Sequence, residues 1–232
     1  MKVLLVNKFH YMKGGAETYY FTIAEALKKM GHQVIFFSMN HHNNVPCEQS
    51  KYFVENREYN NKTTIFEKIK AVINFCYSKE AYNKMTRLIE EEKPDIAILN
   101  NIHRQLTTSV VDALYDKGVK IYWVVHDLIM LCPNYQMLDG LGNICEDCGN
   151  GEFKNCIRKN CVKNSKIKSY LAFKEAKYNK TNKTYEKIDK FITPSKFYMN
   201  KLIKYGFSKD IVEHITNPLA FDYQFECSNN TG

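Results

Sequence analysis

Three short polar stretches, each following an apolar run, hold the side chains of this sequence best suited to chemistry. Their members are Gly14, Gly15, Asn101, His103, His126 and Asp127. Bare glycines let backbone N–H groups approach an anion at the start of a helix, and histidine and aspartate can position a substrate or transfer a proton. A tight turn is the alternative for the glycine pair, and a structural role is the alternative for either histidine. Together, three such stretches favour one ligand site.

The hydrophobic pattern predicts the elements that would position these residues. Short apolar runs, typical of parallel strands covered on both faces, occur at 2–7, 33–38, 95–99, 119–125, 189–193 and 211–216. Apolar residues at helical spacing predict helices at 16–30, 65–77, 80–92, 107–116 and 195–205. This alternation indicates an α/β fold with a doubly wound, mostly parallel Rossmann-like sheet. The three polar stretches then follow strand ends, where such sheets bind their ligands.

Length and composition predict one large cytoplasmic domain. A chain of 232 residues is long enough for a substantial core, and it contains no run of about 18 apolar residues that could span a bilayer. The apolar start, MKVLLVNKF, is too short and too soon polar for a secretory signal. In a reducing cytoplasm the eight cysteines are not expected to form a disulfide framework.

Positive charge is concentrated in one segment. The chain has 33 Lys and Arg against 25 Asp and Glu, and residues 154–190 contain twelve of the former and three of the latter. The helix predicted at about 165–187 is therefore basic and amphipathic, which suits an anionic membrane surface. A solvated lysine face is the alternative. Nucleic acid is not an expected partner, because no recognised nucleic-acid-binding module accompanies this helix.

An irregular insertion at 128–162 interrupts the alternation and needs something to order it. Its five cysteines are Cys132, Cys145, Cys148, Cys156 and Cys161. The C-x-x-C spacing of Cys145 and Cys148 is typical of metal ligands, and two further thiolates would complete a structural zinc site. Buried thiols, or disulfides formed on oxidation, are the alternatives. Five candidates compete for four positions, and no nearby histidine or carboxylate pattern indicates a catalytic metal.

Several motifs, in order along nearly the whole chain, resemble the N-terminal domain of family 4 (group 1) glycosyltransferases, which are retaining enzymes of the GT-B fold. They are GGAE at 14–17, LKKMGHQV at 27–34, IHRQLT at 102–107, VHD at 125–127 with LCPN at 131–134, FITPSKF at 191–197 and TNP at 216–218. The cysteine-bearing insertion resembles that of a subgroup of this family. Each motif is too short to be specific by itself, but their occurrence in the same order as in the family is specific.

The resemblance implies transfer of a sugar from a nucleotide-sugar donor to a glycan or lipid-linked acceptor, with the anomeric configuration retained and no cofactor required. The usual setting would be cell-envelope or surface polysaccharide synthesis, peripheral on the inner face of the cell membrane. Residues 1–218 would form the acceptor-side domain, and 219–232 a linker toward a C-terminal donor-binding domain. The 232-residue chain alone is then expected to lack transferase activity.

The resemblance also implies roles for individual residues. Gly14 and Gly15 would approach the donor, and His126 and Asp127 would take part in catalysis. Asn101, His103 and Ser195 would lie on the acceptor side, and Asn217 and Pro218 would form an interdomain hinge. Asn100 and Asn101 stand where many relatives carry a histidine-containing strand end. Because no carboxylate pair is evident for a double displacement, we expect the acceptor to attack from the leaving-group face.

A stand-alone binding module is the alternative from a different functional class. It would use the cysteine insertion and the basic helix to dock on a partner or a membrane. A dinucleotide-dependent enzyme is disfavoured, because the first loop lacks G-x-G-x-x-G and Ser38, in place of an acidic residue, ends the second strand.

Overall fold

The computed structural model describes residues 1–56 and 75–218 of the chain. Six strands form one parallel sheet in the order β2-β1-β3-β4-β5-β6. They are β1 (Lys2–Val6), β2 (Gln33–Phe37), β3 (Ile96–Leu99), β4 (Lys120–Val124), β5 (Lys190–Thr193) and β6 (Val212–His214). The prediction of a doubly wound α/β, Rossmann-like sheet is confirmed, and all six predicted strands are present within one or two residues at each end.

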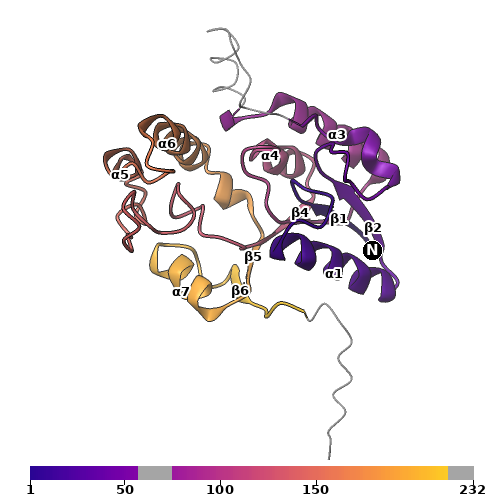
Figure 1. The fold of residues 1–232 in the computed structure, drawn as a ribbon. Helices are drawn as coiled ribbons and strands as arrows, with labels where there is room; N and C mark the ends of the chain where they lie inside the picture. Colours follow the sequence, from indigo (N-terminus) through magenta and orange to yellow (C-terminus); the bar gives the residue numbers. More distant parts are fainter. Residues whose placement is uncertain (57–74, 219–232) are drawn as a thin grey trace, which may run out of the picture.

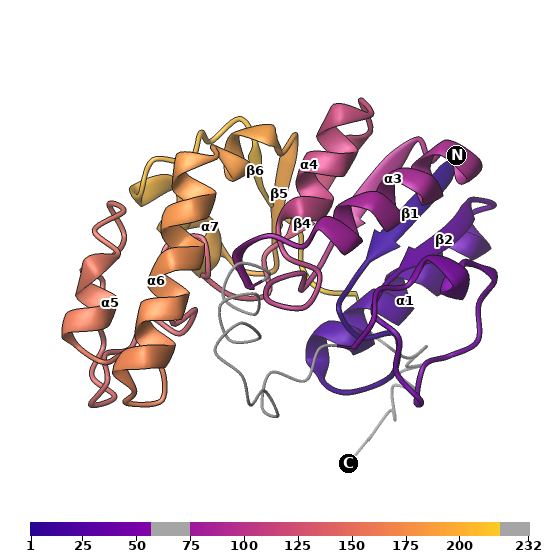
Figure 2. The ribbon, with the colours of Figure 1, turned by 90° about the horizontal axis from the view of Figure 1, so that it is seen from above.

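Helices cover both faces of the sheet (Figures 1 and 2). They are α1 (Gly15–Lys29), α3 (Lys79–Glu92), α4 (Ser109–Asp116), α5 (Lys154–Arg158), α6 (Lys166–Thr181) and α7 (Lys196–Lys204), with short 3-10 turns η1 (Glu48–Tyr52) and η2 (Thr184–Lys187). The helix predicted at 65–77 lies almost entirely outside the described residues. In the described ranges no helix is both long enough and apolar enough to cross a membrane.

Strand β1 shows how the sheet divides the core into two layers. Val3 and Leu5 pack with Tyr20 of α1 on one face, whereas Leu4 and Val6 belong to the larger cluster formed with α3 and α4 on the other. Side chains of a strand alternate between the two faces. An uninterrupted apolar strand is therefore what a sheet covered on both sides requires.

The basic helix predicted at 165–187 is two elements. Helix α6 ends at Thr181, Lys183 takes a left-handed backbone conformation with φ 51°, and η2 follows. A left-handed residue breaks the repeating geometry of an α-helix. The long basic helix is therefore corrected to a helix of 16 residues followed by a separate turn.

The insertion at 128–162 is more ordered than the sequence predicts. It contains the short helix α5 and an isolated antiparallel bridge between Leu138 and Ile144. Helix α5 lies beside α6 in both views (Figures 1 and 2). The carboxylate of Glu146 joins the insertion to α7 through Lys201, Lys204 and Tyr205. Apolar contacts and this polar attachment both hold the insertion against the sheet domain.

Candidate functional site

The strand order creates a crevice at the carboxyl ends of β1 and β3. The chain places β2 on one side of β1 and β3 on the other, so the loops that follow β1 and β3 run in opposite directions. Two hydrogen bonds join these loops: Lys8 N–H donates to the carbonyl oxygen of Asn101 at 2.8 Å, and Asn101 N–H donates to Asn7 Oδ1 at 3.1 Å. The ligand site predicted from the sequence therefore lies at an edge of the sheet where hydrogen bonds hold the two loops together.

The glycine pair lies at this edge, at the start of α1. Gly14 is the N-cap and has extended backbone with φ −171°, and no side chain caps the helix. A Cβ at Gly15 would meet no atom within 4 Å, and one at Gly14 would meet only Glu17 Oε2 at 3.7 Å. Neither backbone conformation nor packing requires glycine here. The exposed backbone N–H groups at the positive end of α1 are consequently open to an anion.

Asn7 and Glu17 join the two ends of the glycine loop, and neither was predicted from the sequence to have a role. Asn7 Nδ2 donates to Glu17 Oε1 at 3.0 Å and to the Phe9 carbonyl oxygen at 2.8 Å. Both side chains are buried. Only their positions could have indicated this pairing from the sequence: Asn7 ends an apolar run, and Glu17 lies two residues after the glycine pair.

His126 follows β4 and is held by Asn100, which follows β3. The imidazole Nε2 lies 2.8 Å from Asn100 Oδ1, and the ring meets that of Tyr19 from α1 edge-on at 5.2 Å between centroids. Burial lowers the pKa of His126 to about 4, so the ring is neutral at neutral pH. Because an amide oxygen only accepts, Nε2 carries the proton and Nδ1 is the acceptor.

Asp127, Asn101 and His103 come together around a cavity of about 280 Å³ at the same edge. Lys8, Arg104, Ile129 and Tyr135 complete its lining among the described residues. Burial is the main cause that lowers the pKa of Lys8, and the Asp127 carboxylate opposes it. Asp127 Oδ1 accepts from the Ile129 N–H at 3.1 Å, which fixes its orientation. The cavity thus combines hydrogen-bonding groups with charges of both signs.

A buried carboxylate from α6 orients His103. Glu175 Oε1 lies 3.1 Å from His103 Nδ1, and both side chains are buried. His103 Nε2 has no hydrogen-bond partner among the described residues, and its ring lies 5.5 Å from that of Trp123. Glu175 was not predicted as a site residue, because it falls within the segment predicted as a basic amphipathic helix. The pairing joins residues 72 positions apart, so no local pattern in the sequence indicates it.

None of the predicted site residues after β5 and β6 lines this cavity. Ser195 Oγ accepts from the Tyr198 N–H at 3.3 Å and caps α7, which is the ordinary role of a serine at a helix start. Asn217 and Pro218 follow β6 at the end of the described chain, and neither lines the cavity. The structure therefore brings together the residues after β1, β3 and β4 but not those after β5 and β6.

The five cysteines of the insertion are free thiols. Cys148, Cys156 and Cys161 share a small apolar cluster with Phe153 and Val162, and burial raises the pKa of Cys148 to about 12. Within residues 1–56 and 75–218, no group of three or more His, Cys, Asp or Glu side chains is arranged to hold a metal ion. Cys132, Cys161 and Cys145 also contribute to the raised pKa of Cys148, so the thiols lie near one another and the zinc site stays a prediction.

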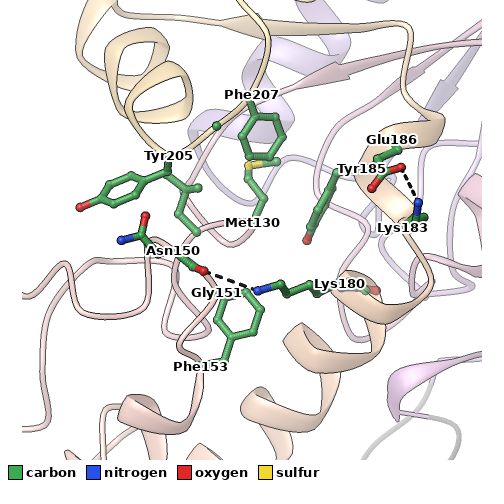
Figure 3. Close-up of a pocket in the computed structure, with 14 residues that line it drawn as sticks. Met130, Asn150, Gly151, Phe153, Lys180, Lys183, Tyr185, Glu186, Tyr205 and Phe207 are labelled. Atoms are coloured by element: carbon green, nitrogen blue, oxygen red, sulfur yellow. Dashed lines mark hydrogen bonds and ion pairs between the residues drawn. The ribbon is translucent and has the colours of Figure 1, made fainter.

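A larger cavity, of about 450 Å³, lies away from the predicted site residues (Figure 3). Met130, Tyr185 and Phe207 form an apolar part of its wall, and Lys180 Nζ reaches across to the carbonyl oxygen of Asn150 at 3.5 Å. This cavity separates the insertion from η2 and the end of α7. Its position makes it a packing gap beneath the insertion and not part of the strand-end crevice.

Comparisons with known proteins concern the family and the fold of the chain. A sequence model described as Glycosyltransferase Family 4 matches residues 13–222, and no curated protein matches the chain. UDP-N-acetylglucosamine 2-epimerase from Rickettsia bellii superposes with a TM-score of 0.50 at 12% identity, over 94% of this chain and 45% of that one. This likeness concerns the fold alone.

Two further solved structures are similar at lower TM-scores. MurG from Acinetobacter baumannii gives 0.46 at 9% identity, over 96% of this chain and 47% of that one. Alr3699/HepE from Anabaena, solved in complex with UDP-glucose, gives 0.47 at 13% identity, over 94% and 44%. The chain thus spans about half the length of these structures.

Proposed function

The chain belongs to glycosyltransferase family 4, and on that basis we propose that it forms the acceptor-side domain of a retaining enzyme. This enzyme transfers a sugar from a nucleotide-sugar donor to a glycan or lipid-linked acceptor. The observation that carries the proposal is the contact between Tyr19 of α1 and the His126 ring after β4, next to Asp127, which lines a cavity with Lys8 after β1. An anion site, a neutral imidazole and an acceptor cavity are the three parts that such a transfer needs.

The start of α1 is suited to stabilise the departing phosphate of the donor. As the bond between sugar and phosphate breaks, negative charge develops on the phosphate oxygen. Backbone N–H groups that are already oriented stabilise such charge without reorganisation, and the α1 dipole adds to this effect. Gly14 and Gly15 keep space beside these groups because neither carries a side chain.

His126 is placed to orient the transferred sugar as a neutral hydrogen-bond acceptor. Its Nε2 proton is engaged by Asn100, so Nδ1 can accept from a sugar hydroxyl. Asp127, Asn101 and His103 line the cavity assigned to the acceptor. Nearby Asn7 and Glu17 do not touch substrate in this proposal but position the glycine loop.

Retention proceeds here without a covalent sugar–enzyme intermediate. A double displacement uses two carboxyl groups about 5 Å apart, and Asp127 is the one carboxylate on the cavity lining among the described residues. The acceptor hydroxyl therefore attacks the anomeric carbon from the face that the phosphate leaves. The new C–O bond forms as the old one breaks, and the hydroxyl proton passes to the departing phosphate.

The remaining half of the cleft belongs to a second domain in this proposal. Residues 219–232 form the linker toward it and Asn217–Pro218 the hinge, so residues 1–218 alone are not expected to turn over substrate. The enzyme acts in cell-envelope or surface polysaccharide synthesis, in the cytoplasm and at the inner face of the membrane. The lysines of α6 would give the membrane-facing side of the domain its positive charge.

A donor screen with the intact enzyme tests the proposal. Release of nucleoside diphosphate is measured for a panel of nucleotide sugars, beginning with UDP-glucose, and the anomeric configuration of the product is read by NMR. We expect turnover with at least one donor, retention of configuration, and a loss of about 100-fold or more in His126→Ala. Absence of binding and turnover with every nucleotide sugar would overturn the assignment, and an inverted product would overturn the retaining mechanism.

A further inference from the structure

Two cysteines of the insertion lie at the two ends of one backbone turn, where α5 ends. The Cys161 N–H donates to the carbonyl oxygen of Cys156 at 3.1 Å, and the Asn160 N–H donates to that of Ile157 at 3.2 Å. Asn160 has a left-handed backbone conformation with φ 48°. These two hydrogen bonds around a left-handed residue form a Schellman motif, which brings the side chains of its first and last residues together. Both of these residues are cysteines here.

The two thiols contact each other in the interior of the insertion. The side chains of Cys156 and Cys161 are hydrogen-bonded to each other, and both belong to the apolar cluster that includes Phe153 and Val162. A disulfide requires Cα atoms about 4.4–6.8 Å apart and Cβ atoms that point toward each other. Two thiols in contact at the ends of one hydrogen-bonded turn satisfy this requirement after small side-chain rotations.

This turn joins the insertion to α6 and also joins parts of the insertion to one another. Cys156 Sγ lies 3.8 Å from the carbonyl oxygen of Ser169 in α6, and the Val162 N–H donates to Ser169 Oγ at 3.0 Å. On another side of the turn, the Gly140 N–H donates to the Lys159 carbonyl oxygen at 3.0 Å. A Cβ at Gly140 would lie only 2.2 Å from this oxygen, so the two backbones are in close contact. A covalent bond across the turn therefore acts on several parts of the insertion.

We propose that Cys156 and Cys161 are a redox modification site, at which a small-molecule disulfide converts the two thiols into an intramolecular disulfide. Cys161 is 7% exposed and Cys156 is 1% exposed, so the Cys161 sulfur attacks one sulfur of the oxidant and releases its other half. The Cys156 sulfur then attacks the Cys161 sulfur and releases the second half. The two cysteines are oxidised, the oxidant is reduced to two thiols, and the two cysteine protons pass to the released thiolates.

Burial slows the first step of this reaction, and contact between the thiols favours the second. Burial raises the pKa of both thiols, so little thiolate is present at neutral pH and the first attack is slow. After that attack, the Cys156 sulfur is already beside the mixed disulfide at Cys161. Closure of the ring is then intramolecular and competes well with attack by another small thiol. We therefore expect one slow oxidation with a single main product.

Mass spectrometry identifies this bond directly, because trypsin cleaves between the two cysteines. Complete digestion yields the peptides NCIR (155–158) and NCVK (160–163), which only a Cys156–Cys161 disulfide joins to each other. The intact protein is incubated with glutathione disulfide, its remaining thiols are capped with N-ethylmaleimide, and it is then digested. We expect the joined peptides to exceed every other cysteine pairing by about tenfold or more, including the pairing of Cys145 with Cys148, and dithiothreitol to separate them.

A variant shows whether the second thiol completes the reaction. Cys156→Ser should form no joined peptides and should retain glutathione on Cys161, because the sulfur that displaces it is absent. Cys47→Ser, at a half-buried thiol outside the insertion, is the matched control and should give the joined peptides as the parent does. Circular dichroism confirms that both variants are folded, and the experiment on the parent protein needs no variant.

Hydrogen–deuterium exchange measures the effect of the bond on the insertion. Amides of residues 154–165 should exchange about threefold or more slowly in the oxidised parent than in the reduced parent, because the new bond restricts opening of the turn. The same treatment should not slow exchange in Cys156→Ser. Equal exchange in the oxidised and reduced parent would contradict an effect of the bond on the insertion.

Three further outcomes contradict the inference. A main product that joins any other two cysteines would place the oxidation site elsewhere. Free thiols at Cys156 and Cys161, after an incubation that fully modifies Cys47, would show that the pair is inert. Stoichiometric zinc whose removal is needed before the joined peptides form would assign these thiols to a metal site. None of these measurements involves sugar transfer, so their result is independent of the proposed function.

Discussion

His126 Nε2 lies 2.8 Å from Asn100 Oδ1, and this contact joins the ends of β3 and β4. Asn100 is itself buried, and its Nδ2 donates to the Val6 carbonyl oxygen of β1 at 3.4 Å. One amide therefore connects the carboxyl ends of three strands. It also determines which imidazole nitrogen carries the proton, and hence which nitrogen of His126 can accept a hydrogen bond from a ligand.

Substitution Asn100→Asp should change the protonation of His126. A carboxylate at hydrogen-bond distance stabilises imidazolium, so the pKa of His126 should rise from about 4 to its ordinary value of 6.5 or above. Titration of the ring by ¹H–¹⁵N NMR measures this. Asn100→Leu removes the acceptor without adding charge and should keep the pKa low. An unchanged His126 titration in Asn100→Asp would show that the two side chains are not in contact in solution.

Stability should fall as the pH decreases from about 6.5 to about 4. Burial lowers the pKa of both His126 and His10 to about 4 from the ordinary 6.5. The unfolded chain therefore binds more protons in this window, and stability that is complete above pH 6.5 is lost as pH falls through it. The loss should reach at most about 3 kcal/mol per site. Urea unfolding at a series of pH values gives the free energy of unfolding.

His10→Gln identifies the share of His10 in this pH dependence. Glutamine does not titrate, and it can still pair with the Tyr20 hydroxyl, which lies 2.9 Å from His10 Nδ1. The variant should show a clearly smaller decrease between about pH 6.5 and about pH 4. His42→Gln, at an exposed position, should follow the parent curve. Parallel curves for the parent and His10→Gln would show that His10 titrates normally.

Gly15→Ala tests whether glycine is needed at this position to leave space for a ligand or to allow the backbone conformation. No atom lies within 4 Å of an added Cβ, and alanine favours a helix by up to about 1 kcal/mol over glycine. Stability should be equal or higher, whereas nucleotide-sugar turnover should fall about tenfold or more. Gly31→Ala is the contrast, because Gly31 has φ +82°. It should lose about 1 kcal/mol of stability and keep its turnover. Full activity of Gly15→Ala would remove the glycine pair from the donor site.

Glu175→Leu should destabilise the domain by about 1–3 kcal/mol, because it leaves His103 Nδ1 buried without its acceptor. Glu175→Gln keeps an acceptor oxygen and should cost less. Glu186→Leu provides the surface control, since Glu186 forms an exposed pair with Lys183 at 3.4 Å and such pairs contribute little. Urea unfolding compares the three variants. Equal stability of Glu175→Leu and Glu186→Leu would contradict a structural pairing with His103.

The sheet was predictable because its strands are continuous apolar runs. Val3 to Val6 are all fully buried, which only a sheet covered on both faces allows. The site was predictable to the extent that it follows strand ends, as His126 and Asp127 do. Glu175 and Asn100 were not assigned roles, because each acts through a partner 72 or 26 residues away. Pairing at that separation depends on tertiary packing and not on local spacing.

In the insertion, the sequence contains a recognisable motif, but it does not indicate the contacts that the structure shows. Its cysteine spacing predicts a metal site, but the polar attachment that the structure describes is a carboxylate. Glu146 contacts Lys201, Lys204 and Tyr205 of the α7 segment, and these hydrogen bonds lower its pKa to about 2. Gly149 packs against the Tyr205 ring, where an added Cβ would lie only 2.2 Å from a ring carbon. A partly exposed glutamate within a C-x-x-C motif gives no local sign of these contacts.

Glu146→Ala should therefore loosen the insertion without unfolding the sheet. The side chain is partly exposed, so the global loss should stay within about 1 kcal/mol, but amide hydrogens of the insertion should exchange faster. Gly149 N–H, which donates to the Glu146 carbonyl oxygen at 3.0 Å, and Gly151 N–H, which donates to that of Cys148 at 2.8 Å, are suitable reporters. Hydrogen–deuterium exchange by mass spectrometry measures them against β1.

The matched control is Glu90→Ala, which removes an exposed ion pair with Lys117 and should leave the insertion unchanged. The pH gives an independent check. A carboxylate with a lowered pKa stabilises the folded state above its ordinary pKa of 4.5 and loses this contribution as the pH falls toward 2. In the parent protein, insertion amides should thus lose protection in that range, while Glu146→Ala should show no such step. Equal exchange in the parent and Glu146→Ala would mean that apolar packing alone holds the insertion against α7.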